Sequence, residues 1–590
     1  MANIYLNNQP AGSSGSLTWG TGSDSNDGLT PATPKLTANA AFQLYDDAPQ
    51  DGDTLFINDG DYVFNALDGR WIIGHESSNI QPMNDYATAI TFSGTNTQGL
   101  RYNLSTSEVR NHVVGKIVIK TSSEKIYGLY SSGSSTNLAD NSITCAARFV
   151  PNSDGTADAS TRFGYYDTCG SGSVVINGGG VSAADGSLVD ISGEAYEYRP
   201  YYQAPTVSLN SSVPAIVNIT EWALNIKLNM TDLLGVIDIA IDSAYPANST
   251  INVSGVTGTV IANNTNASMV YLVRMHNQPD NTSVNNNTVT FSALNNSGAG
   301  GILLLGKDFD SLNNVIDGNN LTINTDSGSG FGLTMGAEGT DGLYSQTSGD
   351  ITNNQLAYTN TGSSSNGVHG INHIYAEGTR SNNTVTGVAI GSLTKASGAT
   401  SSGNTYTIEP LSSSKVYLYA KGAYAGASFS NETLISTPTY TGNFIQALKD
   451  DTTGGADAYC DNTTFADITI QGDVSADATI FSVGFTAGDN STATLTNVTL
   501  PTDAATLTVY GQESEVTYST IVDVNSLSWV TNINQPSGVA PIYTVCSLTV
   551  SNSYQSTQFQ ASTICPLGRD WGTKRYTSDG VIIPNYIHGE

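Results

Sequence analysis

Charged side chains gather at one recurring position of this sequence. The position follows a short apolar run, and successive repeats hold an ionisable residue at it or beside it: His276, Lys307, Glu338, Glu377, Lys421 and Lys449. Two further acids, Asp308 and Asp310, lie close by. Glycoside hydrolysis needs two carboxyl groups roughly 5 to 9.5 Å apart, and neighbouring strands of a sheet are about 4.8 Å apart. The pattern therefore predicts a hydrolytic site with these candidate catalytic residues: Glu338, Glu377, Asp308 and Asp310.

Side chains suited to holding a sugar polymer surround these acids. Polar and cationic groups hydrogen-bond to sugars and aromatic rings stack on them, and the chain has 30 Tyr and 5 Trp. The predicted substrate-binding residues are His276, Lys307, Tyr344, His373, Tyr375, Arg380, Tyr419 and Lys421. Two simpler interpretations stay open. Charges also collect wherever strands end at the solvent, and His373, between Ile371 and Tyr375, equally fits a hydrogen-bonded core histidine.

A repeat of about 34 residues must position these side chains. Each repeat opens with an apolar run of strand length, at residues 271–274, 302–305, 331–335, 371–375, 416–419, 444–447, 480–483 and 507–510. A small or pivot residue follows, at Met275, Gly306, Gly336, Ala376, Ala420, Leu448, Gly484 and Gly511. A polar loop and an asparagine step come next, at Asn286, Asn313, Asn353, Asn382, Asn404, Asn431 and Asn462. Asparagine tolerates the left-handed backbone that a corner between two strands needs.

The repeat predicts an all-β solenoid, because no single turn of this kind can bury its apolar face alone. The runs are too short for helices and are rich in Val, Ile, Thr and Tyr. We therefore expect a parallel β-helix. The expected parts are an N-terminal segment and cap at 1–70, decorated turns at 71–255, regular turns at 256–535 and a C-terminal cap or subunit-contact region at 536–590. The sequence is also compatible with an inserted domain near residues 140–215.

Composition narrows the range of partners. Lys and Arg total 21 against 51 Asp and Glu, a net charge of −30, which argues against nucleic acid or an anionic membrane as partner. No apolar run is long enough to span a membrane, and no signal peptide is visible at the start. The five cysteines are few and scattered, which is typical of reduced thiols. No nucleotide-binding loop or zinc spacing occurs, and the acidic turns near Asp24 and Asp59 lack full calcium-loop spacing, so we expect no cofactor and no metal.

The N-terminal region carries a more specific pattern. Residues 22–34 read GSDSNDGLTPATP, residues 37–48 form an amphipathic helical stretch, and GDTLFI at 52–57 and DGDY at 59–62 follow as a strand and a turn. This pattern resembles the opening of the pectate-lyase-like right-handed parallel β-helix superfamily, which includes secreted polysaccharide-degrading enzymes and bacteriophage tailspikes. The resemblance covers residues 20 to 65, and beyond them only the asparagine pattern is shared.

The resemblance implies a right-handed β-helix with a short N-terminal capping helix. The missing signal peptide favours the phage branch, which implies synthesis in the host cytoplasm, assembly as a homotrimer, a place in the virion, and attachment to a phage tail or adaptor protein. We expect a tailspike or tail fibre that binds host surface polysaccharide and depolymerises it by carboxylate-based hydrolysis. One alternative is a non-enzymatic receptor-binding or structural spike. A second is a polysaccharide lyase that uses His276, Arg274 and Lys307.

Overall fold

The computed structural model describes the chain in separate segments. They are residues 2–46, 53–65, 79–93, 101–103, 115–121, 129–132, 142–144, 146–150, 156–157, 163–167, 173–178, 180–181, 188–196, 199–200, 202–209, 216–231, 234–241, 249–264, 269–276, 280–294, 298–306, 311–326, 330–337, 347–360, 368–374, 376–395, 398–408, 416–421, 426–437, 440, 442–448, 460, 463–473, 479–483, 493–499, 516–522, 575–576 and 582–583. The predicted run at 507–510 and the predicted corner at Asn462 lie outside these segments.

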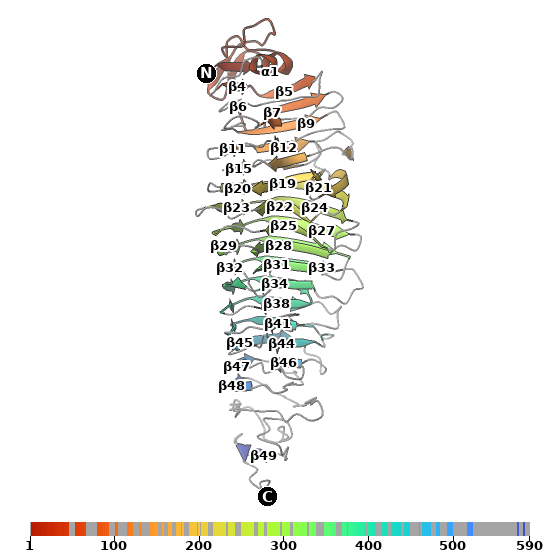
Figure 1. Ribbon diagram of the computed structural model, residues 1–590, viewed down its shortest axis with the longest axis vertical. Coiled ribbons are helices and arrows are strands. Elements are labelled where there is room, and N and C mark those ends of the chain that lie inside the picture. The colour runs from red at the N-terminus through yellow and green to blue at the C-terminus, as the bar shows by residue number, and fades with distance from the viewer. Residues whose placement is uncertain are drawn as a thin grey trace. The chain divides into compact units, whose positions relative to one another are not determined.

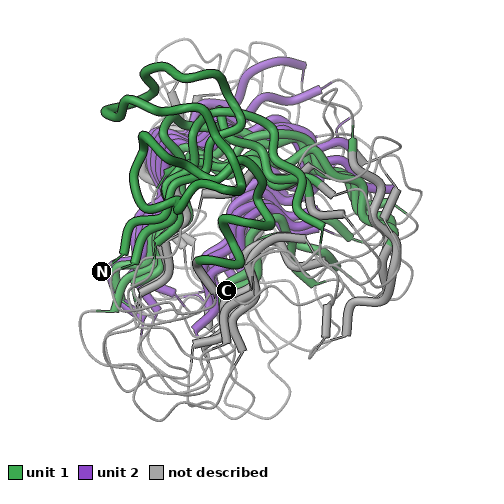
Figure 2. Tube along the Cα trace, turned by 90° about the horizontal axis from the view of Figure 1, so that it is seen from above, with its two compact units in different colours: residues 1–299 green, residues 300–590 purple. Residues whose placement is uncertain are grey.

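The chain divides into two compact units, residues 1–299 and 300–590, shown in green and purple in Figure 2. The helix and strands up to the boundary are β1 (Asn3–Leu6), β2 (Gly12–Ser14), β3 (Leu17–Trp19), α1 (Ala38–Asp46), β4 (Thr54–Ile57), β5 (Gly60–Asn65), β6 (Asn79–Pro82), β7 (Thr88–Ser93), β8 (Arg101–Asn103), β9 (Lys116–Thr121), β10 (Leu129–Ser132), β11 (Ser142–Thr144), β12 (Ala146–Val150), β13 (Thr156–Ala157), β14 (Phe163–Asp167), β15 (Ser173–Asn177), β16 (Gly180–Val181), β17 (Val189–Tyr196), β18 (Arg199–Pro200), β19 (Tyr202–Leu209), β20 (Ile216–Thr220), β21 (Ala223–Thr231), β22 (Gly235–Ile241), β23 (Thr250–Ser254), β24 (Thr257–Asn264), β25 (Met269–His276), β26 (Ser283–Asn285) and β27 (Thr288–Leu294).

The remaining strands are β28 (Gly298–Gly306), β29 (Ser311–Asp317), β30 (Asn320–Thr325), β31 (Gly330–Ala337), β32 (Thr347–Thr352), β33 (Gln355–Asn360), β34 (Val368–Ile374), β35 (Ala376–Glu377), β36 (Thr379–Ser381), β37 (Thr384–Val388), β38 (Ile390–Lys395), β39 (Thr400–Ser402), β40 (Thr405–Ile408), β41 (Val416–Lys421), β42 (Ser428–Ser430), β43 (Thr433–Ser436), β44 (Asn443–Leu448), β45 (Thr463–Gly472), β46 (Thr479–Val483), β47 (Ala493–Thr499), β48 (Val516–Val522), β49 (Arg575–Tyr576) and β50 (Ile582–Ile583).

Each unit is built from stacked parallel strands (Figure 1). In the second unit β31, β34, β38, β41, β44 and β46 pair in that order and form what we call the narrow sheet, with one strand per turn of the chain. The other sheet, the broad sheet, receives two strands from most turns, such as β39 and β40 between β38 and β41. The first unit repeats this plan, with β19, β22 and β25 in a narrow sheet. The parallel β-helix predicted from the repeats is therefore the construction of both units.

The predicted N-terminal helix is present as α1 (Ala38–Asp46). The hydroxyl of Thr37 accepts a hydrogen bond from the backbone N–H of Ala40 (3.2 Å), as an N-cap residue does. Asp24 in turn accepts hydrogen bonds from the backbone N–H groups of Leu36 and Thr37. Phe42 is buried and packs edge-on against Phe64 of β5, with ring centroids 5.6 Å apart. The glycine- and aspartate-rich segment thus holds the start of a helix that packs on the first strands of its unit.

Four of the predicted asparagine steps form the corner between two broad-sheet strands of a turn. Asn313 is also left-handed (φ 58°) but lies within β29, and the corner after that strand holds Gly318 (φ 64°). Asn286, Asn353, Asn382 and Asn431 all have φ between 54° and 56°, the left-handed conformation that the sequence predicts. At two successive corners of the second unit the backbone N–H of Asn353 donates to Ser381 O (3.0 Å) and that of Asn382 to Ser402 O (3.2 Å). Where the sequence predicted a corner at Asn404, the left-handed residue is Gly403.

The residue after each corner points into the interior and forms a ladder. Asn319, Asn354, Asn383 and Asn404 are all buried, and each donates through its backbone N–H and its side-chain amide to the side chain at the same place on the next turn. The donor–acceptor distances between Asn354 and Asn383 are both 2.9 Å. The last acceptor is the carboxyl group of Glu432, which binds the backbone N–H (2.9 Å) and side-chain amide (3.2 Å) of Asn404.

The repeats identified in the sequence omitted one turn of the structure. Strand β38 lies between β34 and β41 in the narrow sheet, so the long interval between the fourth and fifth predicted pivots contains two turns. The strand register pairs Gly336 with Ile374 and Ile374 with Lys395, which makes Ile374, not Ala376, the counterpart of Gly336. The predicted domain boundaries at 70, 255 and 535 remain predictions.

Candidate functional site

Several of the predicted site residues lie outside the described segments: Lys307, Asp308, Asp310, Glu338, Tyr344 and Tyr375. His276 ends strand β25, opposite Ala240 of β22, and the structure describes its backbone alone. By sequence, Glu338 comes directly after β31, whose last residue is Ala337. The proposed roles of these seven residues therefore remain predictions.

Glu377 lies in a different sheet from the charged column in which it was predicted. It ends β35 and pairs with Ser348 of β32 in the broad sheet. The narrow-sheet residue beside Gly336 is Ile374, three positions earlier in the chain. Glu377 is exposed, so its carboxyl group is accessible, but the register separates it from Lys421, which belongs to the narrow sheet.

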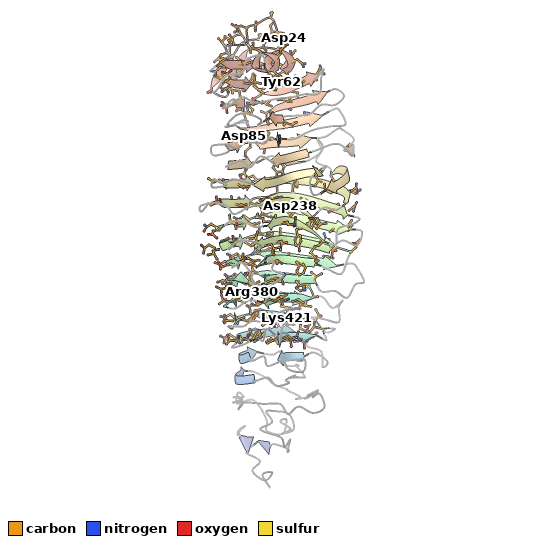
Figure 3. All side chains as sticks on the ribbon, viewed as in Figure 1. Asp24, Tyr62, Asp85, Asp238, Arg380 and Lys421 are labelled. Carbon is orange, nitrogen blue, oxygen red and sulfur yellow. The ribbon has the colours of Figure 1, made fainter. Side chains whose placement is uncertain are left out.

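The narrow sheet of the second unit presents a row of polar and aromatic residues on its outer side. The register aligns Thr334, Asn372, Leu393, Tyr419 and Gln446 on successive strands. Their chain neighbours Leu418 and Ala420 are fully buried, whereas Tyr419 and Lys421 are partly exposed. Because side chains alternate between the faces of a strand, Tyr419 and Lys421 point away from the interior. We call this side the outer face, defined by Thr334, His369, Asn372, Lys395, Tyr419 and Lys421. Lys421 is labelled in Figure 3, and Thr334 and Asn372 are themselves buried.

His369 is an ionisable residue of this face that the sequence analysis did not select. Burial lowers its pKa to about 4, the hydrogen-bond interaction of the protonated ring with Asn372 opposes that shift, and the charge of Lys395 lowers the pKa further. The imidazole is therefore neutral at pH 7. Its ring lies 4.8 Å from that of Phe331. Asn372 also donates to the hydroxyl of Thr334 (3.0 Å). The outer face thus combines a neutral histidine, an amide and a tyrosine with the lysines at 395 and 421.

His373 and Arg380 do not belong to this face. Both side chains are fully buried in the interior of the second unit, and Arg380 Nη1 donates to Ser392 Oγ (2.8 Å) and to Leu393 O (3.2 Å). A side chain without exposed surface does not touch a polymer in solution. The predicted substrate-binding role is thus replaced by an interior position for these two residues. For His373 the core position is the alternative that the sequence left open, but without the hydrogen bond expected for it among the described residues.

The narrow sheet of the first unit carries an ion pair on its outer side. Arg274 Nη1 lies 3.0 and 3.3 Å from the two carboxylate oxygens of Asp238, its partner in the strand register. About a fifth of each side chain is exposed, 22% for Asp238 and 18% for Arg274. Burial raises the pKa of Asp238, and the charge and hydrogen bonds of Arg274 oppose that shift. No sequence pattern marks Asp238 as a site residue, because a single acid between Ile237 and Ile239 fits any half-buried strand.

Metal and membrane sites find no support among the described residues. Within the described segments, no three His, Cys, Asp or Glu side chains group as metal ligands. No helix in the part of the chain that the structure describes is long and apolar enough to cross a membrane.

Comparison with known proteins does not identify a family for this chain. The sequence matches no protein-family model, and it matches no curated protein.

Proposed function

We propose that this protein is a tailspike-like virion protein that binds host surface polysaccharide along the outer face of the second unit. The observation that carries the proposal is that Lys395 of β38 and Tyr419 and Lys421 of β41, all partly exposed, lie on one side of two adjacent strands of one sheet. Neighbouring strands are about 4.8 Å apart, so such a face offers repeated contacts to an extended polymer. Tyrosine supplies a ring for stacking, and the lysine ammonium groups supply hydrogen bonds.

The charge of this face points to an acidic polysaccharide. The chain as a whole carries a net charge of −30, yet no Asp or Glu occurs in β31, β34, β38, β41 or β44, and these strands contribute two lysines. Lysines on the face attract an anionic polymer, and the acidic remainder of the chain repels it from other surfaces. Resemblance to the tailspike branch supports the finer features of the proposal: right-handed winding, a homotrimer, α1 as an end cap, and attachment to a phage tail or adaptor.

Cleavage of the bound polymer is a further part of the proposal. The acids Asp308, Asp310 and Glu338 follow in sequence the ends of β28 and β31. In a parallel sheet the carboxyl ends of the strands meet at one edge, so we expect these acids beside the outer face, where they would act as a hydrolytic pair. Glu377, exposed on the broad sheet, is a second source of a carboxyl group.

A polysaccharide lyase is the second candidate, because the described part of the outer face holds a histidine and two lysines. Elimination from a uronate needs a neutral base and positive charge beside the sugar carboxylate. His369 is neutral at pH 7 and lies near Lys395, whose charge lowers the pKa of the imidazole. A spike that binds without cleaving is the third outcome of the same experiment.

The test is to incubate the full-length protein with acidic and neutral surface polysaccharides and to measure binding, new reducing ends and unsaturated-sugar absorbance. We expect binding of the acidic polymers, weakened roughly tenfold by Tyr419→Ala and by Lys421→Ala. Matched controls are Tyr86→Ala and Lys120→Ala in the first unit, which should bind normally. Equal affinity of all four variants would refute the assignment of the outer face.

Product analysis separates the three activities. Reducing ends without absorbance indicate hydrolysis, and absorbance growth indicates a lyase. Glu338→Gln is expected to abolish hydrolysis and preserve binding; an unchanged rate would remove Glu338 from the catalytic residues. Binding without either product identifies a receptor-binding spike.

A further inference from the structure

The interior of the second unit changes from apolar to polar over two adjacent turns. On the narrow sheet the inward rows run Leu333, Ile371, Ser392, Leu418, Ile445 and Met335, His373, Thr394, Ala420, Ala447. On the broad sheet the corresponding row runs Ile351, Arg380, Ser401, Phe429, Phe465. We call the residues that interrupt the apolar rows the polar layer: His373, Arg380, Ser392, Thr394 and Ser401. All five are buried.

Arg380 crosses this layer from the broad sheet to the narrow sheet. Nη1 donates to Ser392 Oγ and Leu393 O, and the guanidinium carbon lies 5.2 Å from the centre of the Phe429 ring. The two other nitrogens of the guanidinium, Nε and Nη2, are buried and have no hydrogen-bond partner among the described residues. A buried guanidinium keeps its charge, so these two N–H groups are strong donors without an acceptor.

Other unpartnered polar atoms share this space. Both ring nitrogens of His373 and the hydroxyl oxygen of Thr394 are buried and have no hydrogen-bond partner among the described residues. His373 and Thr394 are partners in the strand register, on adjacent turns. Arg380 is close enough for its charge to lower the pKa of His373, and it reaches Ser392, two residues before Thr394. Donors from three strands therefore face one region of the interior.

The buried acid nearest to this region, Glu432, faces other donors. Its carboxyl group accepts hydrogen bonds from Ser401 Oγ (2.6 Å) and from the backbone and side chain of Asn404. Arg380 acts on Glu432 only through its charge, and the hydrogen bonds of Arg380 go to Ser392 and Leu393. The Tyr406 hydroxyl is also buried beside Arg380, but burial raises its pKa and keeps it neutral, so it does not balance the charge of the guanidinium. Isolated buried donors cost about 1 to 3 kcal/mol each, and more when they are charged, so a charged acceptor would stabilise this layer.

We propose that the polar layer binds a small monovalent anion, of the chemical class of chloride, between Arg380, His373 and Thr394. The anion accepts from Arg380 Nε–H and Nη2–H, from the Thr394 hydroxyl and from the N–H of the neutral imidazole. Its charge neutralises the guanidinium, which water would not do. Phe429 and Ala420 limit the space on the following turns, which favours a monatomic ion over phosphate or sulfate. This site is inside the coil and is independent of the proposed polysaccharide face.

Long-wavelength anomalous diffraction from crystals of the full-length protein, purified in sodium chloride, tests the proposal. We expect an anomalous peak within about 3.5 Å of Arg380 Nε and Nη2, and a stronger peak when sodium bromide replaces chloride throughout purification. Electron density without anomalous signal would identify water and overturn the proposal. Absence of density would overturn it equally.

Variants connect the peak to the named donors. Arg380→Met is expected to lose the peak, whereas Lys120→Met, which removes a lysine of an exposed ion pair in the first unit, retains it. If Arg380→Met does not fold, Thr394→Val provides the test, because it removes one donor and keeps the charge; its peak should be weaker at the same chloride concentration. A peak of unchanged height in Thr394→Val would exclude the hydroxyl as a ligand and refute the proposed site.

Unfolding kinetics supply a measurement that needs no crystal. The wild-type protein should unfold in urea on the order of tenfold more slowly in sodium chloride than in sodium gluconate at equal ionic strength, because hydrogen bonds to a buried charge are among the strongest. Arg380→Met, or Thr394→Val in its place, should lose most of that difference. Equal rates of the wild-type protein in the two salts would contradict the proposal.

Discussion

Replacement of Asn383 by alanine should open the interior ladder of the second unit at its centre. Asn383 Oδ1 accepts from the backbone N–H and from the side-chain amide of Asn354, both at 2.9 Å. Its own amide donates to Ile351 O and to Asn404 Oδ1, both at 2.8 Å. All of these side-chain contacts are lost in Asn383→Ala, and both N–H groups of Asn354 that used this acceptor are left inside the protein without it.

The magnitude follows from the fate of the donors. A net hydrogen bond contributes about 1 kcal/mol, and an unsatisfied buried donor costs about 1 to 3 kcal/mol. Two donors left without an acceptor and the loss of the two hydrogen bonds donated by Asn383 therefore predict a destabilisation of roughly 4 kcal/mol. The cavity left by the missing amide is small by comparison.

Hydrogen exchange read by mass spectrometry measures this effect turn by turn. In a stacked structure, local opening reports the stability of the affected turns, whereas one global unfolding midpoint does not. A loss of 4 kcal/mol predicts exchange accelerated roughly a thousandfold in peptides that cover β33, β37 and β40. Peptides from the first unit should exchange as in the wild-type protein.

Asn320→Ala is the matched control, because Asn320 is an exposed asparagine at the start of β30. It should leave exchange unchanged within a factor of about two. If Asn383→Ala and Asn320→Ala gave the same exchange rates over residues 347–408, the ladder would not stabilise the stack and the reasoning would be refuted.

Three further predictions concern other buried positions. Burial raises the pKa of Glu432 from 4.5 to about 7, so the protonated form is favoured in the folded state. The unfolding free energy of the second unit should therefore fall by about 3 kcal/mol as pH rises from 4.5 to 7. Urea titrations of Glu432→Gln should lack this fall. Gly391→Ala would place a Cβ 2.6 Å from a carbonyl oxygen of the next turn and should cost about 1 to 3 kcal/mol; Gly12→Ala, with its nearest atom at 3.9 Å, should be neutral in the same thermal unfolding assay. Arg274→Met leaves the carboxylate of Asp238 without its partner and should destabilise the first unit by about 2 kcal/mol at pH 8, with a smaller loss at pH 4, where the acid is more readily protonated; an equal loss at both pH values would contradict this account.

The asparagine steps were readable because their role is local. A corner needs a left-handed residue wherever it occurs, and asparagine is one of the few residue types besides glycine that adopt this conformation readily. The sequence therefore predicted the corners at Asn286, Asn353, Asn382 and Asn431, and all four have the expected φ. The inward asparagine that follows each corner can be seen in the sequence as the second residue of an Asn-Asn pair. Its hydrogen-bond partner on the next turn is 21 to 35 residues away, and the register between turns determines which residue that is.

The missed strand β38 shows where pattern reading fails. Its inward positions hold Ser392 and Thr394, so it lacks the apolar alternation by which the other strands were found. Omitting one turn moved the fourth pivot to Ala376 and placed Glu377 in a column to which it does not belong. The polar residues that hid the strand are the same ones that face Arg380.

Charged residues inside the coil are the second limit on sequence reading. Arg380 and Glu432 were assigned to surfaces or left unremarked because charged side chains are rarely buried. Only the three-dimensional stack shows that Arg380 lies beside Ser392 and that Glu432 lies opposite Asn404. Candidate sites that depend on long-range register were thus out of reach, and His369 and Asp238 became visible only in the folded chain.

The direction of the asparagine ladder has a consequence for chain growth on the ribosome. Every ladder amide donates towards the C-terminal neighbour, from Asn319 through Asn354 and Asn383 to Asn404. A nascent chain that stacks its turns as they emerge would always expose one side-chain amide without a protein acceptor. Only the next turn to be synthesised supplies that acceptor. We expect the unsatisfied amide to favour stacking of the next turn in the correct register. We also expect it to disfavour stable intermediates that stop after an incomplete number of turns. Glutamate has no side-chain amide to donate onward, so Glu432 ends the series.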